Sequence, residues 1–127
     1  MNYPKVKYTS PSREDGFWGA DCSEDGLEIV NRRDNGSYRP ICKIENPDFA
    51  DNGDCAGNFA LMCASPAMYE CLIETEKLLR FMMIRASTTE AEKAEYRSVL
   101  AQIEHIFFTV NKYSEDLKIE ANVSEDE

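Results

Sequence analysis

The dipeptide Asn35-Gly36 restricts the fold most, because it lies between two stretches of β-forming residues. Asn-Gly is a strong signal of a β-hairpin, since both central residues of a type I′ turn need positive φ. Centring the turn there predicts that Ile29 lies opposite Cys42 and Glu28 opposite Lys43. The first pair gives the sheet an apolar face, and the second is a favourable cross-strand charge pair. The sequence therefore predicts a small antiparallel sheet.

The same register makes two predictions closer to the turn. Pro40 falls opposite Asn31, at a site where its missing N–H points away from the partner strand. Arg32 falls opposite Arg39. Like charges across a strand pair are unfavourable, so this pair predicts that an anion or a carboxylate lies nearby.

The period of apolar residues becomes helical after residue 54. We predict a short helix over residues 55–64 and then Ser65-Pro66 as the N-cap and first position of a second helix, which ends near residue 86. Ser87–Thr89 interrupts the pattern and caps a last helix. The apolar seam of that helix is Tyr96, Leu100, Ile103, Phe107 and Val110. Two long amphipathic helices with a short break between them form an antiparallel helical hairpin.

The predicted fold class is therefore α+β: a small antiparallel sheet with a hairpin at Asn35-Gly36, then a short helix and a long antiparallel helical hairpin. The 127 residues suit one domain. We place a flexible N-terminal arm at residues 1–15, a single α+β domain at residues 16–113 and an acidic C-terminal tail at residues 114–127.

The charge of the chain excludes some classes of partner. With 14 Lys and Arg residues against 24 Asp and Glu residues, the formal charge is −10. Such a chain repels phosphate backbones and anionic membranes, so broad nucleic-acid binding and membrane binding are not expected. The first residues do not resemble a secretory signal, and an odd number of cysteines, five, favours reduced thiols. We therefore expect the protein to be intracellular, in a cytoplasm.

The chain has few residues suited to a metal site or to catalysis. The cysteines are separated by 20, 13, 8 and 8 positions without a C-x-x-C pair, and His105 is the only histidine. Metal sites and thiol catalysis need clustered ligands or a base beside the nucleophile. We expect no metal, no cofactor and no enzymatic activity.

A basic cluster stands out on the predicted hairpin of this acidic chain. Its members are Arg32, Arg33, Arg39 and Lys43. Asp34, Glu45 or an acid of another subunit is one explanation for the cluster, since Arg often pairs with carboxylates. The functional alternative is that these residues bind a small anionic ligand or an acidic patch on a partner.

The helical hairpin also has more apolar side chains than one helix pair over a small sheet can cover. The residues in excess are Leu78, Phe81, Ile84, Ile106 and Phe108. Helices that are apolar on several faces are usually buried. We therefore predict that these five residues form an oligomer interface, most simply in a two-fold homodimer.

The segment Ala56–Leu72, AGNFALMCASPAMYECL, resembles a block found in small phage and prophage proteins of unassigned function. In those proteins an Asn begins an Ala-rich helix that runs to a Pro and a Leu-rich stretch, after an early Trp and short strands. The resemblance covers about residues 16–85. Ala60 and Ala67 depart from it, since the family often has Arg and Glu there. The resemblance implies a phage origin and an architecture, and it implies no shared chemistry.

Three functions follow as hypotheses. The leading one is a phage accessory protein that binds and modulates a host protein, such as a defence or regulatory factor. The alternative is an oligomeric sponge that sequesters a nucleotide-like, phosphate-bearing ligand through the basic cluster. The second alternative is an acidic DNA mimic.

Overall fold

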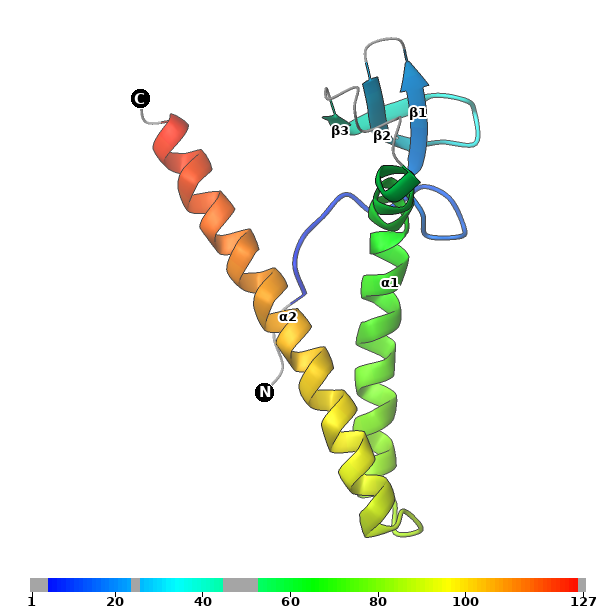
Figure 1. Cartoon of the computed structure of the whole chain (residues 1–127), viewed down its shortest axis with the longest axis vertical. Coiled ribbons are helices and arrows are strands. Elements are labelled where there is room, and N and C mark those ends of the chain that lie inside the picture. Colours follow the sequence, from blue (N-terminus) through cyan, green and yellow to red (C-terminus); the bar gives the residue numbers. More distant parts are fainter. Residues whose placement is uncertain (1–4, 24–25, 45–52, 126–127) are drawn as a thin grey trace. The chain divides into compact units, whose positions relative to one another are not determined.

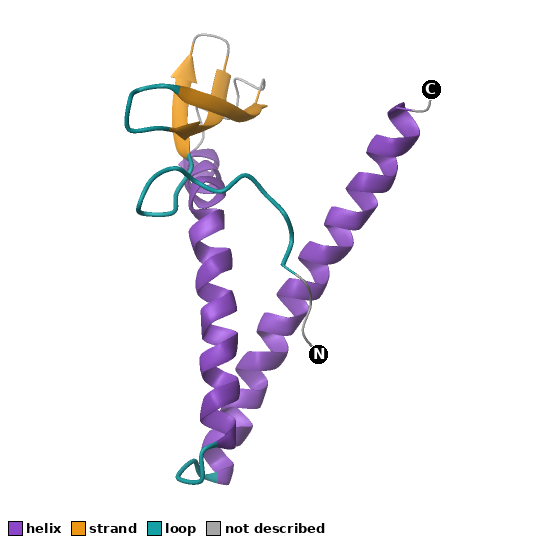
Figure 2. Ribbon diagram, turned by 180° about the vertical axis from the view of Figure 1, so that it is seen from behind, coloured by secondary structure: helices purple, strands orange, loops and turns teal. Residues whose placement is uncertain are grey.

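The computed structural model describes residues 5–23, 26–44 and 53–125. It contains strands β1 (Gly19–Ser23), β2 (Gly26–Arg32) and β3 (Tyr38–Ile44), followed by helices α1 (Gly53–Ile84) and α2 (Glu90–Glu125) (Figures 1 and 2). An antiparallel sheet followed by a helical hairpin confirms the α+β class. The described residues divide into a sheet unit, residues 8–71, and a helical unit, residues 5–7 and 72–125. The division falls inside α1, and thus inside the predicted single domain.

The three strands form an antiparallel sheet in the order β1-β2-β3. Far from the turn, β2 and β3 pair as predicted, with Ile29 opposite Cys42 and Glu28 opposite Lys43. Closer to the turn the register shifts, and Val30 lies opposite Pro40. The predicted Asn31–Pro40 pair is therefore wrong. Ile41 is the extra residue of a β-bulge, which displaces the pairing by one position.

The turn explains this shift. The N–H of Gly36 donates to the carbonyl of Arg33 (3.1 Å), and the N–H of Arg33 donates to the carbonyl of Ser37 (2.8 Å). Gly36 has φ +87°, whereas Asn35 does not adopt positive φ. The loop is thus a three-residue type I turn closed by a left-handed glycine, and the predicted type I′ turn is wrong. The longer loop shifts the register by one residue, and the bulge at Ile41 restores it.

The core of the sheet unit lies between the sheet and the first part of α1. Ile29, Phe59 and Cys63 are buried together, and Ile41 and Trp18 pack against them. Cys42 is exposed, although the prediction placed it on the apolar face, because the bulge presents its neighbour Ile41 to the core instead.

Residues 8–12, which lie within the predicted N-terminal arm, contact the sheet unit. Asn31 is buried; its amide group donates to the carbonyl of Ser10 (3.0 Å) and accepts from the N–H of Ser12 (2.8 Å). The indole N–H of Trp18 donates to the carbonyl of Thr9 (3.0 Å). The compact unit therefore begins at Tyr8, earlier than the predicted residue 16. Residues 1–4 of the arm lie outside the described residues.

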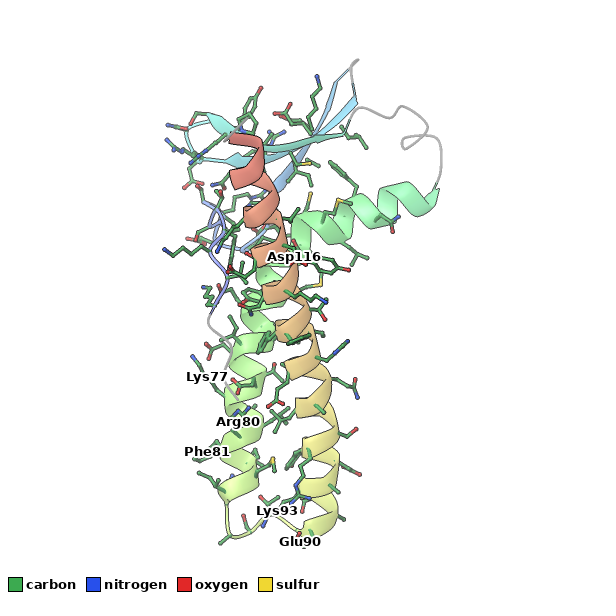
Figure 3. All side chains as sticks on the ribbon, turned by 90° about the vertical axis from the view of Figure 1, so that its left-hand side faces the viewer. Lys77, Arg80, Phe81, Glu90, Lys93 and Asp116 are labelled. Atoms are coloured by element: carbon green, nitrogen blue, oxygen red, sulfur yellow. The ribbon has the colours of Figure 1, made fainter. Side chains whose placement is uncertain are left out.

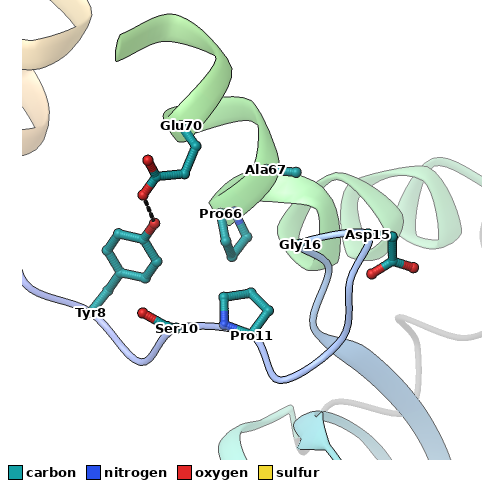
Figure 4. Close-up of a pocket in the computed structure, with 8 residues that line it drawn as sticks. All are labelled: Tyr8, Ser10, Pro11, Asp15, Gly16, Pro66, Ala67 and Glu70. Carbon is teal, nitrogen blue, oxygen red and sulfur yellow. Dashed lines mark hydrogen bonds between the residues drawn. The ribbon is translucent and has the colours of Figure 1, made fainter. Parts of the chain in front are cut away.

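Helix α1 is continuous through Pro66, so the predicted pair of helices separated at Ser65-Pro66 is wrong. Proline has no N–H to donate to the carbonyl of Met62 four residues earlier. The hydroxyl of Ser65 donates to that carbonyl instead (2.7 Å). Figure 4 shows the helix changing direction at Pro66. Next to the bend, the carbonyl of Cys63 accepts a hydrogen bond from the N–H of Trp18 (2.9 Å).

The break between the helices is confirmed. Thr89 and Glu92 form a capping box: the Thr89 hydroxyl accepts from the N–H of Glu92 (3.1 Å), and the Glu92 carboxylate accepts from the N–H of Thr89 (3.2 Å). The hydroxyl of buried Thr88 donates to the carbonyl of Met82 (2.6 Å) near the end of α1. Helix α2 then continues to Glu125, past the predicted boundary at residue 114. Residues 126–127 lie outside the described residues.

Among the residues that the structure describes, neither helix combines the length and the apolar character needed to cross a membrane.

Candidate interaction surfaces

Arg32, a member of the predicted basic cluster, has a partner within the sheet. Arg32 lies opposite Tyr38, not opposite Arg39 as predicted, because the three-residue loop changes the register. Its guanidinium forms an ion pair with Asp21 of β1 and contacts the carbonyl of Ala20 (3.5 Å). The carboxylate partner of Arg32 is thus Asp21 of the same chain, and the ion pair links β2 to β1.

The other three basic residues remain on the surface. Arg33, Arg39 and Lys43 are exposed, and none of them forms an ion pair with another described residue. Arg39 lies opposite Asn31 in the sheet, and Lys43 lies opposite Glu28. These three cations remain accessible to an anion.

The predicted interface residues are all exposed in the single chain. The exposed fraction is lowest for Ile106, at 41%, and highest for Ile84, at 81%, with Leu78, Phe81 and Phe108 between them. The seam predicted on α2 is confirmed, since Leu100, Ile103 and Phe107 are buried.

The helical unit therefore has more apolar surface than it covers. Among its described residues, three large apolar side chains are buried and eight are exposed. The exposed ones are Leu78, Phe81, Ile84, Val99, Ile106, Phe108, Tyr113 and Leu117. Exposed apolar residues that gather on one element are typical of interaction surfaces.

The end of α1 carries one such surface, which we call the α1 end surface: Leu78, Phe81 and Ile84. Figure 3 shows Phe81 on the side of α1 that faces away from α2. An open hollow of 470 Å³ lies here, and its lining residues are Arg80, Phe81, Met83 and Ile84. The guanidinium of Arg85 lies 5.9 Å from the centre of the Phe81 ring, within range of a cation–π interaction.

Arg80 anchors this part of α1 to α2. Its guanidinium pairs with Glu76 of its own helix and with Glu104 of α2 (2.6 Å). Hydrogen bonding to Glu76, followed by the contribution of Glu104, raises the pKa of Arg80 although partial burial lowers it. The Arg80 cation at the edge of the hollow is therefore already paired with two carboxylates.

A second hollow, of 370 Å³, belongs to the sheet unit (Figure 4). The hydroxyl of Tyr8 donates to the carboxylate of Glu70 (2.5 Å), and the Tyr8 ring packs edge-on against Trp18 and Tyr69. Burial, and then the hydrogen bond to Glu70, raise the pKa of Tyr8 to about 12. Asp15, which also lines the hollow, accepts a hydrogen bond from the N–H of Phe17. Tyr8 and Glu70 bond to each other, which indicates a contact that holds the N-terminal segment in place.

The structure describes the side chains of three of the five cysteines. Cys63 is buried, and burial raises the pKa of its thiol, whereas Cys42 and Cys71 are exposed. In the described part of the chain, no three His, Cys, Asp or Glu side chains lie close enough together to hold a metal ion. His105 is exposed on α2.

Comparison of the chain with protein families, with curated proteins and with solved structures gave no match. The phage origin implied by the sequence resemblance stays a prediction.

Two features of these surfaces were missed in the sequence. Asp21 was not identified as the partner of Arg32, because the pairing of β1 with β2 leaves no local signal. Val99, Ile106 and Tyr113 recur at intervals of seven, and this spacing could have identified a second apolar line on α2 beside the seam.

Proposed function

We propose that this protein acts without catalysis, by binding another protein through the α1 end surface. The observation that carries the proposal is the excess of exposed over buried apolar side chains in the helical unit. Leaving Phe81 and Ile84 in water is unfavourable by roughly 1.5–3 kcal/mol for each side chain, compared with full burial. A bound partner recovers much of this free energy.

The geometry of the surface favours a particular kind of partner. Phe81 and Ile84 line an open hollow, which in this proposal takes an apolar side chain of the partner. Arg85 lies beside Phe81, and its charge favours a carboxylate next to that apolar side chain. If the chain has the phage origin that the resemblance implies, its target is a protein of the bacterial host, and we include a defence or regulatory factor as the target class in the proposal.

The test compares three forms of the full-length chain as bait in a bacterial lysate: wild type, Phe81→Lys and Leu61→Lys. Leu61 is the matched control, since it is an exposed apolar residue of α1 in the sheet unit. Direct binding of each captured protein, once purified, is then measured by calorimetry. We expect Phe81→Lys to weaken binding by about 30-fold or more, as for a central interface residue, and Leu61→Lys to leave it unchanged. Equal binding by all three forms would contradict the proposal.

Arg33, Arg39 and Lys43 support a second candidate, the sequestration of a phosphate-bearing ligand, because none of them is paired with a described acid. A thermal-shift screen against cyclic and linear nucleotides tests it. A ligand of this site raises the melting temperature of the wild type but not of Arg39→Ala. A shift that survives in Arg39→Ala would place the ligand elsewhere.

A further inference from the structure

Helix α2 carries a line of exposed apolar residues beside its buried seam. We call Val99, Ile106, Tyr113 and Leu117 the outer stripe; each is between 41% and 66% exposed. The first three are spaced by seven residues, which is close to two helical turns, and therefore lie on one face of α2. This is the spacing of residues that pack against a neighbouring helix.

The α1 segment of the helical unit does not extend along the whole of α2. The ion pair between Arg80 and Glu104 places these two residues at the same level. Because a helix rises about 1.5 Å per residue and the two helices are antiparallel, Leu72 is level with about residue 112 of α2. Tyr113 and Leu117 lie beyond this level, so the α1 segment of the helical unit, residues 72–84, does not reach them.

The charge pattern of the stripe favours a second copy of this chain as the partner. The polar residues on the same face, Gln102 and Thr109, are uncharged, although the chain carries a formal charge of −10. A basic partner would be recognised by acids along the stripe, and none lies there between Val99 and Tyr113. An identical uncharged stripe fits, since it adds no like charges at the contact.

The sizes of the side chains set the orientation. In a parallel pair, Tyr113 would face the same residue of the partner and Val99 would face Val99. In an antiparallel pair centred on Ile106, each small Val99 faces a large Tyr113. Packing of large against small side chains fills a helix interface better than pairs of equal size.

We infer that α2 pairs with α2 of a second copy of this chain, antiparallel and two-fold about Ile106, through the outer stripe. This pairing is separate from the proposed target site, because it uses α2 and leaves Phe81 free. From Val99 to Leu117 the stripe is only about 27 Å long. The interface is therefore small, and the expected dissociation constant is on the order of 10 µM.

Sedimentation equilibrium of the full-length chain between about 1 and 200 µM tests the pairing. The wild type is expected to move from monomer to dimer over this range. Ile106→Glu places two carboxylates together at the two-fold axis and is expected to weaken the dimer by about 100-fold. Phe108→Glu is the matched control, since Phe108 is similarly exposed on α2 but lies off the stripe, and it is expected to leave the association unchanged. A wild-type monomer at all concentrations, or equal weakening by both variants, would overturn the inference.

A charge pair tests the orientation. Val99→Lys alone is expected to weaken the dimer. Val99→Lys combined with Tyr113→Glu is expected to restore part of the association, because an antiparallel pair sets each Lys against a Glu of the other copy. In a parallel pair the same double variant sets Lys against Lys and Glu against Glu, so a double variant weaker than Val99→Lys would refute the antiparallel arrangement. Binding of a target through Phe81 is expected to survive all of these substitutions, which keeps the two proposals distinguishable.

Discussion

Replacing Asn31 by Ala tests how the N-terminal segment is held on the sheet. Asn31 is buried, and its side chain makes two hydrogen bonds to the backbone, with Ser10 and Ser12. Each is worth about 1 kcal/mol net, and the loss of a buried partner adds to this. The expected decrease in the free energy of unfolding is about 2–3 kcal/mol. For a unit of this size, the melting temperature falls by roughly 4–8 °C for each kcal/mol.

The assay is urea denaturation followed by the fluorescence of Trp18. This residue is the only tryptophan, and its indole N–H donates to Thr9 in the same segment, so it reports on the sheet unit. Asn58→Ala is the control, because Asn58 is exposed on α1, where Ala is the better helix former. Its stability is expected to equal or slightly exceed that of the wild type. If Asn31→Ala changes the free energy of unfolding by less than about 0.5 kcal/mol, the segment is not held by these bonds.

Three further predictions concern single contacts. The pKa of Tyr8 is raised to about 12, so its contribution to stability is present below its ordinary pKa and is lost as the pH rises through about 12. Tyr8→Phe is therefore expected to reduce the fall in stability above pH 10, measured by denaturation at a series of pH values. An unchanged fall would refute the contact with Glu70. Thr89→Ala removes the capping box and is expected to lower the stability of the helical unit by about 1 kcal/mol, measured by circular dichroism, whereas an unchanged melting curve would show that the cap contributes nothing. Gly36→Ala forces a side chain into the left-handed region and is expected to destabilise the sheet unit by about 1 kcal/mol. Denaturation monitored by Trp18 fluorescence measures this change, and an unchanged stability would contradict the three-residue turn.

The hairpin was predictable from the sequence, but the length of its loop was not. Asn35-Gly36 supplies residues suited to positive φ: a type I′ turn needs both of them, whereas the three-residue loop needs only Gly36. What distinguishes them is the bulge at Ile41, which lets this side chain pack on the core with Ile29 and Phe59. That choice depends on a helix later in the chain, so local signals could not decide it.

In the helices, too, local signals predicted some features and not others. The buried seam of α2 followed from its period, because local spacing alone decides which residues share a face. Ser65-Pro66 is ambiguous, since the same pair begins a helix or bends one. The hydroxyl of Ser65 donates to the carbonyl of Met62, which Pro66 leaves without a donor. The backbone N–H of Trp18 donates to the next carbonyl, that of Cys63. The contact with Trp18, more than 40 positions away, was not visible in the local pattern.

The partner of Arg32 could not be predicted from local signals. Arg33, Arg39 and Lys43 are exposed, as a ligand site requires, but Arg32 is held by Asp21. The expected like-charge pair depended on a register that one extra loop residue changed.

Hydroxyl-radical footprinting of the full-length chain tests most directly whether the helical unit leaves apolar residues uncovered. At low protein concentration, Phe81 and Ile106 are expected to be oxidised readily, while Ile103 and Phe107 are protected. At high concentration, Ile106 is expected to become protected and Phe81 to stay reactive. Protection of Phe81 at every concentration in the isolated chain would contradict both the exposed α1 end surface and the function proposed from it.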